Sequence, residues 1–423
     1  MKYCEMSAES LKELLAELNN EYETIKAQGL SLDMSRGKPS STQLDLSNDI
    51  LNVINENNYV TDNGIDCRNY GNLEGIPQAR KLMGDLLSVP ADNVLVCGNA
   101  SLNIMYDCVA RSMLFGVMGT TPWCKLPKVK FLCPVPGYDR HFKITETFGI
   151  EMINIPMTES GPDMDLVEKL VASDSSIKGM WCVPKYSNPQ GIVYSDETVK
   201  RLASMKTAAK DFRLYWDNAY AIHYIYEDVA LLEILSECEK AGNPDRVFEF
   251  CSTSKVTFAG GGISAVASSL ANIEWIKKSL TAQTISYDKI NQLRHVLYFK
   301  NAEGVKAHMN KHADFLKPKF DAVLEMFEKE LGDTGVATWL KPMGGYFISV
   351  DTMEGCAKAV VAKCKEADVV LTGAGATFPY GKDPKDSNIR IAPSYPTPDE
   401  LSKAAKLFTL CVKIISIEKL LSE

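Results

Sequence analysis

The chain has 423 residues, of which 45% are hydrophobic and 24% are charged, with 27 glycines and 19 prolines. This composition is typical of a globular protein and excludes a disordered or fibrous one, and the length exceeds one ordinary core, so two domains are expected. The formal net charge of −8 argues against nucleic acid or an anionic membrane as the main partner, because either would select a basic face.

The sequence also indicates a cellular compartment. No segment approaches the roughly 20 uninterrupted apolar residues that span a bilayer, and the start, MKYCEMSAES, has acidic side chains where a signal peptide needs a cationic region. The 12 cysteines include no Cys-x-x-Cys pair and no Cys/His cluster with zinc-ligand spacing. We therefore expect a cytoplasmic protein with reduced, mostly buried thiols and no metal site.

The first expected element is an amphipathic helix over residues 7–29. Gly29 stands where the helix would stop, and apolar side chains recur at helical spacing at Leu11, Leu14, Leu15, Leu18, Tyr22 and Ile25. From about residue 92 to about residue 270, short apolar runs alternate with stretches of helical length such as 195–209. This alternation predicts an α/β fold with a mainly parallel sheet covered by helices.

After about residue 300 the pattern changes to a long charged helix over 303–331, the apolar run GGYFISVD and a final helix. Thr397 offers a hydroxyl at the start of that last helix, Pro398 lies in its first turn, and Glu400 is placed to close a capping box. We divide the chain into an N-terminal arm with part of a small domain, a large domain, and a C-terminal small domain, at 1–45, 46–298 and 299–423.

Polar side chains follow three of the apolar runs. Asn188 follows CVPKYS, Asp217 and Tyr220 come at the end of RLYWDNAY, and Ser252 and Lys255 come at the end of VFEFCSTSK. In an open α/β sheet, ligands bind beyond the carboxyl ends of the strands. An amide, a carboxylate, a phenol, a hydroxyl and an amine are therefore expected at one edge of one sheet.

The order and separation of these motifs resemble those of the fold-type I, pyridoxal-phosphate-dependent aminotransferases of class I. The chain is more closely similar to the aspartate aminotransferase-like branch that is grouped with MocR-type proteins. The resemblance extends from RGKP at 36–39 to NIRIAPSYP at 388–396. It implies a seven-stranded, mainly parallel sheet in a large cofactor-binding domain, a smaller α+β domain built from both chain ends, and pyridoxal 5'-phosphate as the cofactor.

The resemblance also implies how the cofactor ring is held. Lys255 would form a Schiff base with the cofactor aldehyde and later move a proton at the substrate α-carbon, and a partly desolvated lysine suits this because its pKa is lowered. Asp217 would pair with the ring nitrogen and keep it protonated. Tyr220 and Asn188 would bond the ring oxygen, and Tyr138, in PVPGYDRHF, would stack on the ring face.

The cofactor phosphate is expected at the turn that follows Gly98. Asn99, Ala100 and Ser101 lead into a helix there, and free amides at a helix N-terminus bind anions. Ser252 would add a hydroxyl. Tyr70 resembles the tyrosine that reaches the phosphate of a neighbouring subunit, which implies a homodimer with shared active sites.

The chain departs from the family pattern at Ile263. Most class I members carry a phosphate-binding arginine eight residues after the Schiff-base lysine, and Ile263 occupies that position here. Either Lys185 or the backbone amides of the glycine-rich stretch 259–262 would have to neutralise the phosphate instead.

Substrate recognition is also carried over by resemblance. Arg390 would grip the substrate α-carboxylate with two parallel hydrogen bonds, which suit guanidinium geometry. Gly37 would bring its backbone close to the same carboxylate, Asn188 would also contact the substrate, and Arg36 is a candidate for a second carboxylate. The implied reaction is a ping-pong transfer of an amino group between an amino acid, with aspartate or glutamate as first choice, and a 2-oxo acid.

Other functions and simpler roles stay open. The same cofactor geometry supports a carbon–sulfur lyase or an alanine-type transaminase. A MocR-like sensing domain is disfavoured, because the aminotransferase-like features begin by about residue 35 and the charge is acidic. Several candidates also have structural explanations: a helix cap for Asp217, core packing for Tyr138, an ordinary turn at 98–101, close packing at 259–262 and a surface position for Arg36.

Overall fold

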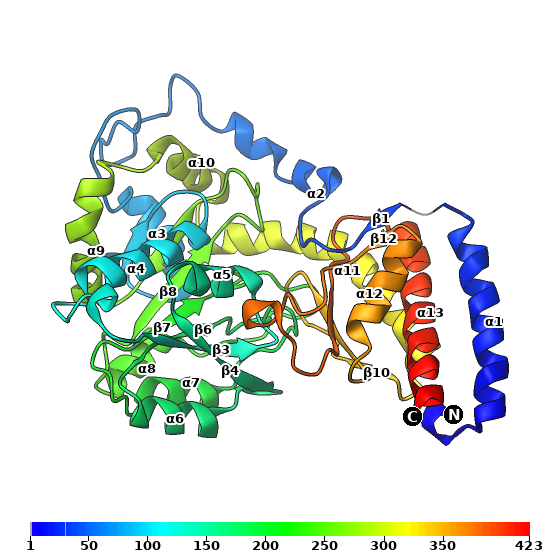
Figure 1. Cartoon of the computed structure of the whole chain (residues 1–423). Coiled ribbons are helices and arrows are strands. Elements are labelled where there is room, and N and C mark those ends of the chain that lie inside the picture. Colours follow the sequence, from blue (N-terminus) through cyan, green and yellow to red (C-terminus); the bar gives the residue numbers. More distant parts are fainter. Residues whose placement is uncertain (1, 30) are drawn as a thin grey trace.

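The structure, a computed structural model, describes residues 2–29 and 31–423. Its centre is an eight-stranded sheet with the strand order β2-β9-β8-β7-β6-β3-β4-β5 (Figure 1). The strands are Val94–Val96 (β2), Lys130–Val135 (β3), Glu151–Thr158 (β4), Gly161–Pro162 (β5), Ile177–Cys182 (β6), Arg213–Asp217 (β7), Val247–Ser252 (β8) and Ser264–Ala267 (β9).

The sheet is mainly parallel. The pairs from β8 through β4 run parallel, whereas β9 is antiparallel to both of its neighbours and β5 is antiparallel to β4. The predicted α/β class is therefore confirmed. The sheet has one strand more than the seven predicted, because the two residues of β5 fold back onto the end of β4.

Helices cover both faces of this sheet (Figure 1). One face packs against α4, α5 and α9 and the other against α6, α7 and α8. The helices of this lobe are Pro77–Leu87 (α3), Ser101–Phe115 (α4), Asp139–Thr147 (α5), Met164–Ser173 (α6), Asp196–Ser204 (α7), Ile234–Lys240 (α8), Leu270–Gln283 (α9) and Lys289–Phe299 (α10). The short helix Ser41–Asp45 (α2) leads toward them from the N-terminal segment.

The alternation of side chains along β7 determines the face of the sheet on which the Asp217 side chain lies. Tyr215 packs in the core on the α4 and α5 side, and Trp216 packs in the core on the α6 and α7 side. Because side chains alternate between the faces of a strand, Asp217 at the end of β7 lies on the same face as Tyr215. The neighbouring strand β8 places Glu249 opposite Trp216 and Phe250 opposite Asp217.

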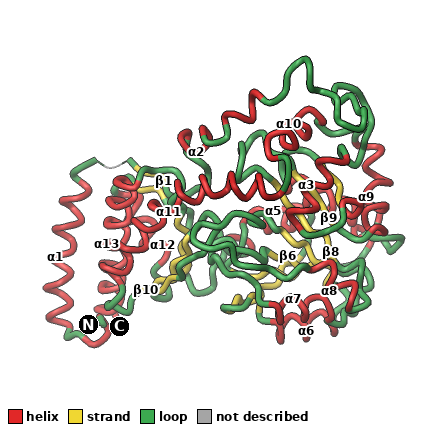
Figure 2. Tube along the Cα trace, turned by 180° about the vertical axis from the view of Figure 1, so that it is seen from behind, coloured by secondary structure: helices red, strands yellow, loops and turns green. Residues whose placement is uncertain are grey.

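A second lobe contains both ends of the chain, which lie close together in Figure 1. Its antiparallel sheet has the order β10-β11-β13, and β1 pairs with β12. The view from behind in Figure 2 shows α1, α12 and α13 in this lobe, with α11 reaching toward the first lobe. The elements are Ala8–Lys26 (α1), Leu32–Asp33 (β1), Ala302–Leu331 (α11), Ala337–Trp339 (β10), Ile348–Thr352 (β11), Ala357–Glu366 (α12), Val369–Val370 (β12), Asn388–Ile391 (β13) and Pro398–Ser422 (α13).

The helices expected near the chain ends are present. Leu11, Leu18 and Tyr22 of α1 are buried against α13 and its neighbours, and the Thr397 and Glu400 side chains form the predicted capping box of α13. The helix expected over 195–209 is shorter, because Met205 leaves the helical backbone conformation and ends α7. The predicted domain boundaries at 45 and 298 stay predictions.

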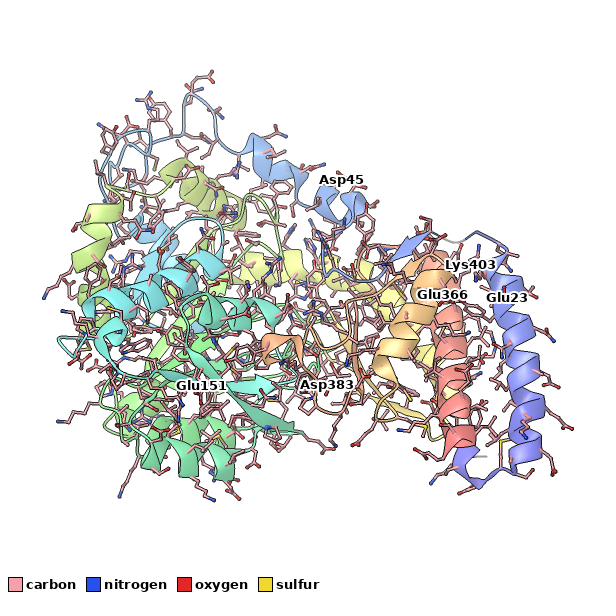
Figure 3. All side chains as sticks on the ribbon, in the orientation of Figure 1. Glu23, Asp45, Glu151, Glu366, Asp383 and Lys403 are labelled. Carbon is pink, nitrogen blue, oxygen red and sulfur yellow. The ribbon has the colours of Figure 1, made fainter. Side chains whose placement is uncertain are left out.

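Most of the thiols are buried, as expected from the sequence. All twelve cysteines are free, and all except Cys4 and Cys124 are buried. Charged side chains are spread over both lobes, with Glu23, Glu366 and Lys403 exposed on the second lobe (Figure 3). Across residues 2–29 and 31–423, no helix combines the length and the apolar character needed to cross a bilayer.

Candidate active site

Lys255 lies three residues beyond the end of β8, at the carboxyl edge of the sheet. Its Nζ atom is 4.6 Å from the centroid of the Tyr220 ring, and the Tyr220 side chain is buried. Burial lowers the pKa of the Lys255 amine, and the negative charge of Asp217 opposes that shift. The structure therefore brings Lys255, Asp217 and Tyr220 together around an amine that loses its proton more readily than a surface lysine.

Asp217 presents one carboxylate oxygen without a partner. The residue is 3% exposed, and its Oδ2 lies 2.9 Å from His141 Nε2, which donates to the carboxylate. Its Oδ1 is buried and has no hydrogen-bond partner in the part of the chain that the structure describes. A buried carboxylate oxygen is costly to leave unpaired, so this atom is suited to a donor from a bound molecule.

His141 was not identified from the sequence, although it lies in the motif PVPGYDRHF. It is on the first turn of α5, its ring stacks on Trp181 with centroids 4.4 Å apart and planes at 9°, and it is 1% exposed. The edge of its ring meets Tyr138, whose centroid is 4.9 Å away. The spacing of three residues between Tyr138 and His141 at a helix start is the sequence signal that could have indicated a shared site.

Arg390 comes from β13 of the second lobe and reaches the first lobe. Its Nη1 donates to Asp139 Oδ1 at 2.9 Å and to Asn188 Oδ1 at 3.3 Å, and its guanidinium carbon lies 4.6 Å from the Phe347 ring centroid. The side chain is mostly buried, and its Nε has no partner among the described residues. The site therefore lies between the two lobes, with guanidinium N–H groups left to bind an anion.

Gly37 packs against Phe347, the ring that also contacts Arg390. A Cβ atom at this position would lie 2.6 Å from the Phe347 ring, which is closer than real contacts allow. Only glycine therefore lets this backbone segment approach the Phe347 ring so closely.

The turn from Gly98 to Ser101 forms a cradle of backbone groups. Ser252 and Ser254 donate from their hydroxyls to the Asn99 carbonyl oxygen, at 3.3 and 2.8 Å. Ala100 is the residue before α4, and no side chain caps this helix. The first amides of a 15-residue helix are therefore available to an anion.

Three candidate residues, Tyr70, Arg36 and Lys185, are not assembled here. Tyr70 is 79% exposed on a loop, and Arg36 is exposed beside the segment that includes Asp33. Ile263 is 1% exposed and packs in the core. Lys185 forms an ion pair with Asp228 at 2.7 Å and donates to the Ala221 carbonyl oxygen, so it is not free to neutralise a phosphate, contrary to one suggestion from the sequence.

The chain is similar to known aminotransferases over nearly its whole length. Residues 6–423 match the family model described as aspartate amino-transferase. The chain is 45% identical over 427 residues to an aspartate aminotransferase of Corynebacterium glutamicum, with 99% of each chain covered.

Solved structures show the same fold. The crystal structure of an aspartate transaminase from Corynebacterium glutamicum superposes with a TM-score of 0.97 at 44% identity over 99% of both chains. A more distant α-aminoadipate aminotransferase from Thermus thermophilus, solved with N-(5'-phosphopyridoxyl)-L-leucine, has a TM-score of 0.74 at 18% identity over 95% of each chain. The chain belongs to the aspartate aminotransferase family, among the fold-type I aminotransferases, and is an enzyme.

Proposed function

We propose that this aminotransferase binds pyridoxal 5'-phosphate at the carboxyl edge of the sheet, with Lys255 as the attachment point. This proposal is supported mainly by two groups on the same edge of the sheet: the partly desolvated amine of Lys255 and the unpaired Oδ1 of Asp217. The cofactor has an aldehyde for an amine, a ring nitrogen for a carboxylate and a phosphate for the α4 amides, so the residues fit the group. The phosphopyridoxyl ligand of the Thermus thermophilus relative supports the same cofactor.

The residues around the ring have separate tasks. Asp217, held by His141, keeps the ring nitrogen protonated, while Tyr220 and Asn188 bond the ring oxygen and Tyr138 covers a ring face. When bound, the cofactor withdraws electrons from the substrate α-carbon. Burial lowers the pKa of the Lys255 amine, which favours its acting as the base that takes the α-carbon proton and later returns it in the transfer.

The phosphate is assigned to the cradle at the start of α4. Asn99, Ala100 and Ser101 supply backbone and side-chain donors, and Ser252 supplies a hydroxyl that already reaches this turn. Tyr70, exposed on its loop, would reach the phosphate of a second copy of the chain. The proposal therefore includes a homodimer with shared sites.

For substrates we propose aspartate or glutamate with a 2-oxo acid, in a ping-pong reaction. Arg390 would bind the α-carboxylate, exchanging its contacts with Asp139 and Asn188 for the substrate, and Gly37 keeps the backbone close. Arg36 is the candidate for the second carboxylate. The aspartate aminotransferase name of the Corynebacterium glutamicum relative supports this substrate class, and the free thiols support a reducing, cytoplasmic location.

A substrate screen tests this function against its rivals. The purified holoenzyme is incubated with each common amino acid, with and without 2-oxoglutarate, and 2-oxo acid products are measured. The proposal expects sustained turnover of aspartate or glutamate only when the acceptor is present. Turnover without an acceptor would show a lyase, and a preference for alanine would show an alanine-type transaminase.

A further inference from the structure

The proposed phosphate cradle contains no obvious cation. A phosphate group carries about 1.5 to 2 negative charges at neutral pH, whereas the Ser252, Ser254 and α4 groups that form the cradle are neutral. Position 263, where most class I relatives have an arginine, is a buried isoleucine. A positive charge has to come from elsewhere in the fold if this site binds phosphate tightly.

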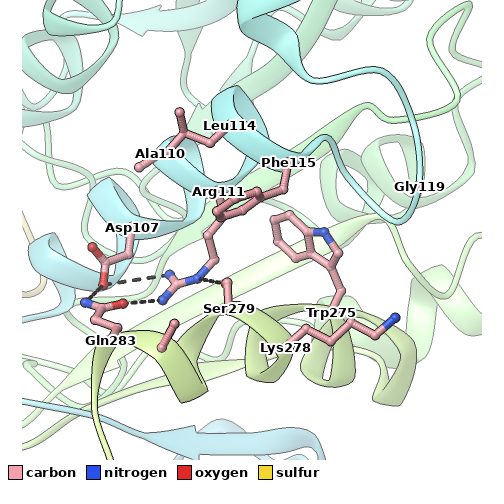
Figure 4. A pocket seen from close by; sticks show the side chains of 11 residues that line it. Asp107, Ala110, Arg111, Leu114, Phe115, Gly119, Trp275, Lys278, Ser279 and Gln283 are labelled. Carbon is pink, nitrogen blue, oxygen red and sulfur yellow. Dashed lines mark hydrogen bonds and ion pairs between the residues drawn. The ribbon is translucent and has the colours of Figure 1, made fainter.

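Several nearby cations are already engaged. Lys185 pairs with Asp228, and Lys289 donates to the Gly71 carbonyl oxygen at 2.9 Å. Arg111 lies in a separate cavity between α4 and α9, where it contacts Asp107, Ser279 and Gln283 (Figure 4). Lys185 and Arg111 therefore each have a carboxylate partner, and the Lys289 amine is directed to the Gly71 carbonyl oxygen.

Arg294, on α10, differs from them. Its Nη2 donates to the Gly261 carbonyl oxygen at 3.4 Å and also contacts Asn291 Oδ1. Its Nε is buried without a partner, and no carboxylate within the described residues forms an ion pair with it. A guanidinium that is partly buried without an anion is unfavourable, so this group is suited to an anionic ligand.

The face of α10 that carries Arg294 borders the cradle. Asn291, one turn earlier, donates to the Gly262 carbonyl oxygen at 2.9 Å. Gly262 in turn lies against Ser254, because a Cβ at Gly262 would be 2.7 Å from Ser254 Oγ. Ser254 Oγ donates to the Asn99 carbonyl oxygen. The chain of contacts from Arg294 to the start of α4 therefore passes through adjacent glycines and one serine.

Helix geometry directs the Arg294 side chain toward the start of α10. Side chains on a helix point back toward its N-terminus, and Tyr287, just before α10, lies 3.9 Å from the place of a Cβ at Gly98. Arg294 therefore leans toward the end of α10 that adjoins the cradle. A Cβ at Gly261 would stand 3.6 Å from Arg294 Nη2, an ordinary van der Waals distance, so the guanidinium lies directly beside Gly261.

We propose that Arg294 supplies the positive charge for the cofactor phosphate in this chain. It does so from α10, in place of an arginine at position 263. A guanidinium has five N–H donors, and only those on Nη2 make the contacts with Gly261 and Asn291. The inference rests on the proposed function, because it concerns the phosphate of the proposed cofactor.

The test separates the phosphate from the rest of the cofactor. Cofactor-free, full-length wild type, Arg294→Gln and Arg294→Lys are titrated with pyridoxal 5'-phosphate and with pyridoxal, which lacks the phosphate, and binding is followed by absorbance. Arg294→Gln should raise the Kd for pyridoxal 5'-phosphate about 10- to 100-fold and leave the Kd for pyridoxal within about twofold. Arg294→Lys, which keeps the charge, should lose less.

Arg201→Gln is the matched control, because Arg201 pairs with Asp165 and Glu168 on helices of the opposite face. It should change neither Kd. The inference would be overturned if Arg294→Gln kept the wild-type preference for the phosphorylated cofactor, or if it lost equal affinity for both cofactor forms. If the Gln variant does not fold, the same comparison is made with Arg294→Lys. Wild type that binds neither compound would instead contradict the proposed function.

Discussion

Asp217→Asn is predicted to weaken the binding of pyridoxal 5'-phosphate. The carboxylate is 3% exposed, and His141 contacts only its Oδ2, so Oδ1 is the atom that a ring nitrogen would meet. A hydrogen bond to a charged group contributes about 1.5–3 kcal/mol. Because the amide removes that charge, the Kd should rise roughly 10- to 150-fold.

The assay is an absorbance titration of the cofactor-free, full-length protein. Glu249→Gln is a matched control, since Glu249 is equally buried on the neighbouring strand β8 but lies opposite Trp216, on the other face of the sheet. It receives the same acid-to-amide change and should keep the wild-type Kd. Equal Kd values for Asp217→Asn and wild type, or equal losses in both variants, would refute the assignment of Oδ1 to the ring nitrogen.

Two further predictions concern the burial of Glu249 and the binding of substrate. Burial raises the pKa of Glu249 from 4.5 to about 8. Between these pH values the folded chain holds a proton that the unfolded chain releases. The free energy of unfolding therefore decreases as the pH rises, by at most about 5 kcal/mol in total. Glu249→Gln should therefore melt higher than wild type at pH 8 and lose that advantage near pH 5; an advantage that does not vary with pH would contradict this. Arg390→Lys should raise the KM for the amino acid about 10-fold or more, because lysine cannot form the paired contact with a carboxylate. The affinity for the cofactor, measured by titration, should stay constant. An unchanged KM would show that Arg390 does not bind the substrate carboxylate.

The features that the sequence predicted are those encoded locally. Asp217 and Lys255 follow apolar runs, and the end of such a run in an α/β fold lies at the ligand edge of the sheet. The capping box at Thr397 and Glu400 needs only residues three apart. Both kinds of pattern depend on short spacings, so they survive without knowledge of the tertiary structure.

The features that the sequence missed depend on contacts between distant segments. His141 meets Asp217 across 76 positions, and Arg390 meets Asp139 across 251. Neither pairing follows from spacing, because it requires the order and register of β3, β7 and β13. Arg294 could not be predicted for the same reason. Its distinguishing property is the lack of a carboxylate partner, and that depends on how distant segments pack.

Some predictions lie beyond a single chain. Tyr70 is exposed on its loop, and its proposed partner is the phosphate of a second copy. Arg36 is exposed and lacks a described ion-pair partner. Their roles stay predictions, because each depends on a partner or substrate that meets the chain from outside.

The attachment of the cofactor to Lys255 is the central claim, and covalent mapping tests it most directly. The holoenzyme is treated with borohydride, which fixes a bound pyridoxal group to its lysine, then digested, and the labelled peptide is identified by mass spectrometry. We expect one labelled peptide, with the modification on Lys255. A label on any other lysine, or a holoenzyme that takes up no label, would contradict it.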